Sequence, residues 1–200
     1  MCSSDLLFFA NELRYRGRKE ESVAEAKRAL KSDPVSALAN EQLADAYFSA
    51  RQYDLAIEQY LKTLEMFPGR PSSLDNLGWA HVYVKMYDLG ISEIEKSGED
   101  PDLSSELAYV YAIRGDKARA ENILKRLRQL SKEMPIAAHH FAIVYAGLNQ
   151  RQQALEYLKK AHQEHSPVMR MLKVDARFDQ LRSDPEFQNL MQRVGLAPEP

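Results

Sequence analysis

Apolar side chains recur along the chain at intervals of three and four residues, in stretches separated by short polar turns. This spacing predicts amphipathic α-helices, because residues three or four apart lie on one face of a helix. Residues 41–68 show the pattern most clearly. They contain two such helices back to back, with Ala44 and Tyr47 in the first and Ala56 and Tyr60 in the second.

The same pattern returns along the chain with spacings of 34, 34, 30 and 34 residues, so that repeats begin near residues 3, 37, 71, 101 and 135. We number the places of each repeat from its first residue. Places 8 and 20 hold small residues, which lets the two helices of a pair approach closely. The residues at these places are Ala10, Ala44, Gly78, Ala108 and Ala142, and Ser22, Ala56, Gly90, Ala120 and Ala154. Because the third repeat is four residues short, we expect its second helix to lose a turn and the array to bend near residues 97–100.

A turn is expected between the two helices of each repeat, and a proline follows the second helix and ends it. The turn residues at place 15 are Gly17, Arg51, Lys85, Gly115 and Asn149. Glycine and asparagine at such a position are typical of a left-handed helix C-cap. One helical hairpin cannot bury its apolar stripes alone, so neighbouring hairpins must stack.

This pattern of Leu-Ala/Gly-x-x-Tyr in the first helix and Ala-x-x-x-Tyr/Leu in the second resembles the tetratricopeptide repeat (TPR). The resemblance covers about residues 3–168. It implies an all-α, right-handed solenoid of about five helix-turn-helix repeats. The tryptophan common at place 4 is absent, and the one tryptophan, Trp79, stands at place 9 of the third repeat.

After Pro167 the period fails. Residues 169–196 are predicted to form a C-terminal helical cap, because a solenoid needs its open apolar end covered. Within it, Asp184 and Pro185 predict the start of a helix, with Asp184 as the N-cap. The alternative is a docking motif for another domain, and residues 197–200 are expected to be a disordered tail.

The motif LKVDxRFDxLRSDPxFQ, from Leu172 to Gln188, resembles the ending of repeat regions in bacterial signalling and regulatory proteins. Those proteins carry a winged-helix, protein kinase or nucleotide cyclase effector domain. Ala176 departs from that ending, which usually has proline there. The resemblance implies a bacterial origin and a regulatory setting, and it brings no effector domain to this chain.

Composition excludes several classes of protein. The net charge of −2 argues against direct nucleic-acid binding, which needs a basic stripe. Residues 1–100 carry a net charge of −5 and the remainder +3. The only cysteine is Cys2, so a cytoplasmic location is expected, and no apolar run is long enough to span a membrane. The chain begins inside a helical pattern, which is typical of a piece of a larger protein.

No catalytic, cofactor or metal site is predicted, because nucleophile, phosphate-loop and metalloprotease motifs are absent. His139 and His140 diverge by about 100° on a helix and do not easily face one ion. His162 and His165 have no evident third ligand.

In the TPR fold, places 2, 5, 9, 12 and 13 of the first helix line a concave groove. The candidate partner-binding residues are Asn11, Glu41, Asp45, Asp75, Trp79, Tyr83, Ser105, Tyr109, His139 and Ile143. Trp79 and Tyr109 are candidate anchors, unless the C-terminal segment or a neighbouring repeat covers them. Some TPR domains bind the C-terminal carboxylate of a peptide through a clamp of lysine, asparagine and arginine side chains. The lysines and arginine of such a clamp are missing from the corresponding region of this sequence. Carboxylates beside aromatic and aliphatic patches favour a basic amphipathic segment as the partner.

The sequence therefore predicts a non-catalytic protein–protein interaction scaffold that binds a protein or peptide, as the regulatory region of a bacterial signalling or transcriptional regulator. One alternative is a homo-oligomerisation module, such as a homodimer. The other is a regulatory domain that senses a small ligand on behalf of a kinase, cyclase or transcription factor.

Overall fold

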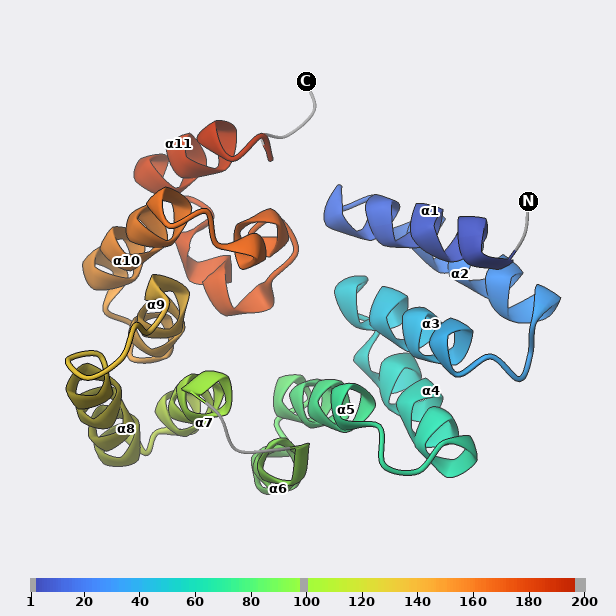
Figure 1. Cartoon of the computed structure of the whole chain (residues 1–200), viewed down its shortest axis with the longest axis horizontal. Coiled ribbons are helices and arrows are strands. Elements are labelled where there is room, and N and C mark those ends of the chain that lie inside the picture. Colours follow the sequence, from blue (N-terminus) through green and yellow to red (C-terminus); the bar gives the residue numbers. More distant parts are fainter. Residues whose placement is uncertain (1–2, 98–100, 197–200) are drawn as a thin grey trace. The chain divides into compact units, whose positions relative to one another are not determined.

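A computed structural model of the chain describes residues 3–97 and 101–196. Across these residues the chain is all-helical and has no strand, which confirms the predicted fold class (Figure 1). Cys2, the expected bend at residues 98–100 and the expected tail at residues 197–200 lie outside the described residues. The chain divides into two compact units, Met1–Gly98 and Glu99–Pro200, and each is considered by itself.

Unit 1 consists of helical hairpins in which consecutive helices pack against each other. Its helices are α1 (Ser3–Tyr15), α2 (Lys19–Ser32), α3 (Ala37–Ser49), α4 (Tyr53–Met66), α5 (Pro71–Tyr83) and α6 (Tyr87–Ser97). Helix α3 lies between α1 and α5, while α2 also packs against α3 and α4 against α5 (Figure 1). Helix α6 has 11 residues, whereas α2 and α4 have 14, as the short third repeat predicts.

Unit 2 begins with two more hairpins and ends in a segment of short helices. Its elements are α7 (Pro101–Arg114), α8 (Lys117–Leu130), α9 (Ala138–Gly147), α10 (Arg151–Gln163), the 3₁₀-helices η1 (Pro167–Met171) and η2 (Ala176–Leu181), and α11 (Pro185–Arg193). The predicted N-cap of α11 is confirmed, since the Asp184 carboxylate accepts a hydrogen bond from the Glu186 amide at 2.8 Å. Helix α11 and η1 pack on α10, but η2 turns back to contact α9.

Small residues hold the two helices of each hairpin close together. Ala44 and Ala56, at places 8 and 20, are fully buried. A Cβ atom on Gly78 would lie 2.9 Å from the Gly90 carbonyl oxygen, and one on Gly90 would lie 2.6 Å from that of Gly78. Helices α5 and α6 therefore touch backbone to backbone, at a distance that only glycine permits.

The turn at place 15 is left-handed in each hairpin, including the two where the residue is not glycine or asparagine. Arg51 and Lys85 have φ angles of 64° and 66°. The Lys85 amide donates to the Val82 carbonyl at 3.0 Å and the Met86 amide to the His81 carbonyl at 2.9 Å, which is the Schellman pattern of helix termination. The turn geometry is thus imposed by the hairpin, and Arg51 and Lys85 adopt it at a conformational cost.

We predict that Gly78→Ala lowers the free energy of unfolding of unit 1 by about 1–3 kcal/mol, because the added methyl group collides with the α6 backbone. Fluorescence of Trp79, the only tryptophan, during urea unfolding would measure the change. Glu95→Ala is the matched control, as Glu95 is exposed on α6. An equal effect of the two substitutions would contradict the close approach.

We predict that Lys85→Gly stabilises unit 1 by about 0.5–1 kcal/mol, since glycine adopts a positive φ without steric cost. The same replacement at exposed Lys62 within α4 should destabilise by about 1 kcal/mol. The comparison uses the same fluorescence assay. Destabilisation by both substitutions would show that the left-handed turn carries no strain.

Candidate functional site

The sequence-predicted residues of unit 1 lie on α1, α3 and α5, and one of them, Glu41, is a buried carboxylate. Only 7% of Glu41 is exposed. Its carboxylate accepts hydrogen bonds from the Ser73 hydroxyl at 3.0 Å and from the Ser72 hydroxyl, and it pairs with the Arg70 guanidinium. Burial raises the pKa of Glu41, but these donors more than offset it, so the net pKa is lowered. Glu41 thus fastens α3 to the start of α5.

Asp45, one turn further along α3, joins three helices in a similar way. Its Oδ1 atom accepts hydrogen bonds from the Tyr60 hydroxyl at 2.5 Å and from the Asn76 amide at 3.1 Å. Burial raises the pKa of Asp45, and the positive charge of Arg14 offsets only part of that effect. Both carboxylates are therefore partnered inside unit 1.

Two arginines that the sequence interpretation passed over compensate the acidic residues on this face. Arg14 donates to the Asn11 side-chain oxygen at 2.7 and 3.1 Å and acts electrostatically on Asp45, while Arg70 pairs with Glu41. Arg14 stands at place 12 of the first repeat, which is one of the groove places, so the repeat pattern could have identified it as a residue of this face. Arg70 precedes α5, and no repeat place identifies it.

Four aromatic residues of unit 1, from α3, α4 and α5, form one cluster. The Tyr83 ring stacks on Tyr53 with centroids 5.0 Å apart and lies 5.6 Å from Phe48 and 6.0 Å from Trp79. Trp79 is only 5% exposed, whereas Phe48, Tyr53 and Tyr83 are each partly exposed. We call Phe48, Tyr53 and Tyr83 the aromatic edge. Only Tyr83 among them is a sequence-predicted contact residue, although Phe48 stands at place 12.

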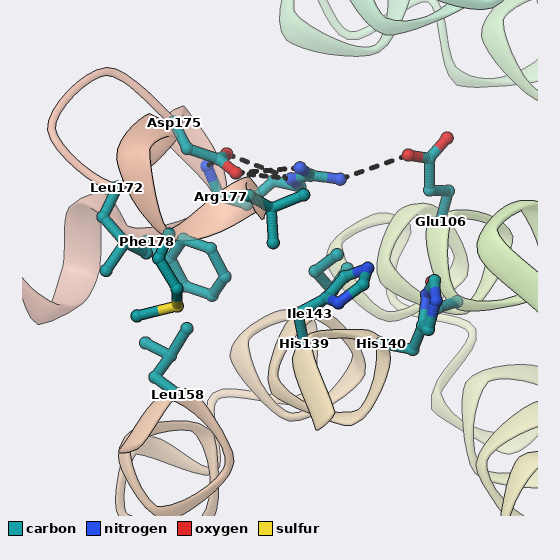
Figure 2. A pocket seen from close by; sticks show the side chains of 12 residues that line it. Glu106, His139, His140, Ile143, Leu158, Leu172, Asp175, Arg177 and Phe178 are labelled. Atoms are coloured by element: carbon teal, nitrogen blue, oxygen red, sulfur yellow. Dashed lines mark hydrogen bonds and ion pairs between the residues drawn. The ribbon is translucent and has the colours of Figure 1, made fainter. Parts of the chain in front are cut away.

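In unit 2, the predicted residues Ser105, His139 and Ile143 line a cavity of about 130 Å³, while Tyr109 is buried beside Gly147. The Ser105 hydroxyl lies 3.1 Å from His140 Nδ1. The His139 and His140 rings, whose centroids are 3.9 Å apart, extend from α9 toward this space (Figure 2).

The C-terminal segment supplies the opposite wall of the cavity, with Leu172, Arg177 and Phe178 (Figure 2). The Arg177 guanidinium donates to the Asp175 carboxylate at 2.8 Å and reaches Glu106 on α7 at 3.3 Å. Phe178 is buried against this face. The motif that stood out in the sequence thus covers the candidate groove of unit 2.

Further interactions fasten this segment to the hairpins. The Gln180 amide donates to the Ala146 carbonyl of α9, and Lys159 of α10 pairs with Glu186 of α11 at 2.8 Å. Leu181, Phe187 and Leu190 are buried. The segment is therefore packed along α9 and α10.

The described part of the chain contains neither a metal-binding cluster nor a membrane-spanning helix. Residues 3–97 and 101–196 contain no group of three or more histidine, cysteine, aspartate or glutamate side chains that could hold a metal ion. None of the helices described is long and apolar enough to cross a membrane.

Antiparallel helix pairs, in contact through small residues and stacked on their neighbours, define an all-helical repeat fold. The sequence model of the tetratricopeptide repeat matches residues 9–71. Together with the solved structures that share the architecture, this match confirms the predicted TPR fold. TPR folds are typically non-catalytic. No curated protein matches the sequence.

Three solved structures illustrate the likeness. A thermophilic TPR protein of Thermus thermophilus is 19% identical, covers 88% of this chain and 99% of its own, and has a TM-score of 0.65. PilF of Pseudomonas aeruginosa is 20% identical over 96% of this chain and 91% of its own, with a TM-score of 0.57. The Cut9–Hcn1 hetero-tetramer of the APC/C matches at 16% identity over 99% of this chain and 44% of its own, with a TM-score of 0.56. At these identities the likeness shows the fold alone.

We predict that Glu41→Gln and Asp45→Asn alter the pH dependence of stability in opposite directions. Because the pKa of Glu41 is lowered on folding, its ionised form stabilises unit 1 above the ordinary pKa of 4.5, and that stabilisation is lost as the pH falls. Glu41→Gln should therefore cost about 1.5–3 kcal/mol at pH 7 and much less at pH 3.

For Asp45 the sign is reversed, since its pKa is raised on folding. The folded state favours the protonated carboxyl, so its stabilisation is present below the ordinary pKa of 3.8 and is lost as the pH rises. Asp45→Asn keeps an oxygen acceptor for Tyr60 and should stabilise unit 1 at pH 7, with the gain fading toward pH 3. Urea unfolding followed by Trp79 fluorescence tests both variants. Parallel pH profiles for the two would contradict this account.

Proposed function

We propose that the chain is a non-catalytic protein–protein interaction scaffold whose partner segment binds unit 1 at the aromatic edge. TPR proteins generally mediate such interactions, and stacked repeats suit this role because their first helices present a continuous surface. The observation that carries the proposal is the cluster of three partly exposed rings, Phe48, Tyr53 and Tyr83. Aromatic side chains provide large contact areas at low entropic cost, so they are effective anchors.

The partner's proposed chemistry is a basic amphipathic segment. Residues 1–100 carry 17 Asp+Glu against 12 Lys+Arg, and this net negative charge favours a partner that carries basic residues. Tyrosine faces also attract lysine and arginine side chains. Asn11 lies on α1 and Asp75 on α5, and we include both in the proposed contact face, with the nearly buried Trp79 supporting the Tyr83 ring from α5.

Unit 2 is assigned a different role in this proposal. Its predicted contact residues Ser105, His139 and Ile143 line the cavity beneath the C-terminal segment, so this segment competes with any partner for that face. The cavity of about 130 Å³ is also smaller than the roughly 300–1,000 Å³ typical of pockets for drug-sized ligands. Protein binding at unit 1 is therefore favoured over small-ligand sensing.

The wider setting we propose is the regulatory region of a cytoplasmic bacterial signalling or transcriptional regulator. The support is the C-terminal motif from Leu172 to Gln188, which resembles the ending of repeat regions in such proteins. A single cysteine in the chain accords with a reducing compartment.

Selection from a displayed library of random 16-residue peptides tests this function. We expect the enriched peptides to combine lysine or arginine with aromatic or aliphatic residues. Their affinity, measured by fluorescence anisotropy, should fall about tenfold or more in Phe48→Ala/Tyr83→Ala, because two anchoring rings are lost.

Leu61→Ala is the matched control, since Leu61 is an exposed apolar residue of α4 outside the aromatic edge. Circular dichroism would verify that each variant is folded. Enrichment of acidic peptides would overturn the proposed partner chemistry. Equal binding by the wild type and the double variant would overturn the proposed site.

A further inference from the structure

The short helix η2 lies where the repeat pattern predicts a partner. Helix α11 and η1 pack on α10, whereas η2 turns back to contact α9. The α9 residues on this side stand at groove places of the fifth repeat: His139 at place 5, Ile143 at place 9 and Ala146 at place 12. A segment of the chain itself therefore covers these places.

Three side chains within four positions of η2 contact the hairpins as a short peptide ligand would. The Arg177 guanidinium reaches the Glu106 carboxylate of α7 at 3.3 Å. Phe178 is 3% exposed and lines the cavity. The Gln180 side-chain amide donates to the Ala146 carbonyl of α9. A charged group, a ring and an amide so close in sequence form a linear motif, and a segment of another protein can carry the same groups.

The fit of η2 against the hairpins leaves space. The cavity of about 130 Å³ is lined on one side by Phe178 of η2 and on the other by His139 of α9 (Figure 2). Protein interiors contain few voids larger than a water molecule, and side chains that line a void lose packing contacts. A segment that filled this space would therefore gain contacts that η2 lacks.

We propose that this face of unit 2 is an interaction surface held closed by η2, and that its partner is a protein segment in which an aromatic residue follows arginine. The chemistry is that of the present occupant. Glu106 binds the guanidinium, and the site of Phe178 receives the ring. The surface shares no residue with the aromatic edge, so this inference does not rest on the function proposed for unit 1.

The structure of η2 favours local opening. It has six residues, and a 3₁₀-helix has poorer hydrogen-bond geometry than an α-helix. The next helix is fastened elsewhere, since Lys159 of α10 pairs with Glu186 of α11 at 2.8 Å and Phe187 is buried. Short segments of this kind open at less cost than the whole fold. In the proposed exchange, η2 leaves α9 while α11 stays on α10.

Competition with the attached segment sets the expected affinity. A tethered segment acts at an effective concentration on the order of millimolar. The apparent affinity of a partner is reduced by the fraction of molecules in which η2 is open. A free peptide should therefore bind the wild type weakly, and more tightly once the contacts of η2 are removed.

A peptide with the sequence of residues 175–183, DARFDQLRS, tests the inference on the full chain. It begins at Asp175 because this carboxylate accepts from the Arg177 guanidinium at 2.8 Å and orients it. With blocked ends and a fluorescein label, its binding would be measured by fluorescence anisotropy. We expect Arg177→Ala/Phe178→Ala to bind the peptide at least about tenfold more tightly than the wild type does.

Phe187→Ala is the matched control, because Phe187 is also a buried ring of the C-terminal segment but does not line the cavity. It should bind the peptide no more tightly than the wild type. Circular dichroism would verify that each variant is folded. Arg177→Gln removes no buried ring, and it should still strengthen peptide binding about threefold or more if the double variant fails to fold.

Two further changes test the chemistry of the contact. Glu106→Gln, added to Arg177→Ala/Phe178→Ala, should weaken peptide binding about fivefold or more, because the guanidinium loses its carboxylate. Glu121→Gln is the control, since Glu121 is an exposed carboxylate of α8. A peptide that itself carries Arg177→Ala and Phe178→Ala should bind at least about tenfold more weakly.

Several results would overturn the inference. These are equal binding, or no binding, by the wild type and the opened variants; an equal gain in Phe187→Ala; and indifference to Glu106→Gln. The two proposals also fail separately. Binding of this peptide should be unchanged in Phe48→Ala/Tyr83→Ala, whereas peptides selected by the aromatic edge should be indifferent to Glu106→Gln.

Discussion

Close contact between two small residues governs each hairpin of this protein. Where Gly78 meets Gly90, the backbones of α5 and α6 touch, and there is no room for a methyl group on either side. In the first hairpin the contact adds a hydrogen bond, since the Ser22 hydroxyl donates to the Ala10 carbonyl at 2.8 Å. Because this contact sets the distance between the helices, the larger residues beside it can fill the remaining space without voids. Stacking of one hairpin on the next depends on that spacing.

Polar residues on the first helices also hold neighbouring hairpins together. Glu41 binds Ser72, Ser73 and Arg70, and Asp45 binds Tyr60 and Asn76. A buried carboxylate is tolerated only when such donors satisfy it. The acidic residues that the sequence assigns to this face therefore serve the architecture in part. The aromatic edge, by contrast, combines large apolar area with partial exposure.

The C-terminal segment of unit 2 packs against the face of α9 that the sequence predicts to be a groove. Arg177 is held by Asp175 within the segment and by Glu106 of α7, while Phe178 and Leu181 are buried. The motif from Leu172 to Gln188 is thus explained by packing and hydrogen bonding within this unit. Its residues cover part of the α9 surface, whereas no such segment covers the aromatic edge in the described part of unit 1.

The sequence by itself determined the helical hairpins and their turns. Small residues at places 8 and 20 are readable in the chain, and so is Asp184 as an N-cap, because helix pairing and capping depend on residues a few positions apart. It also pointed to the left-handed turn, although Arg51 and Lys85 show that the hairpin imposes this geometry even on residues that resist it.

Only the tertiary structure decided which groove residues remain accessible. Trp79 is prominent in the sequence yet nearly buried, whereas Phe48 and Tyr53 gain importance through their contacts with Tyr83. Likewise, no repeat place indicates that Arg70 pairs with Glu41, 29 positions earlier, or that Arg177 reaches Glu106 across 71 positions. Exposure and charge compensation are set by side chains from other helices, and a periodic pattern within one helix contains no information about them.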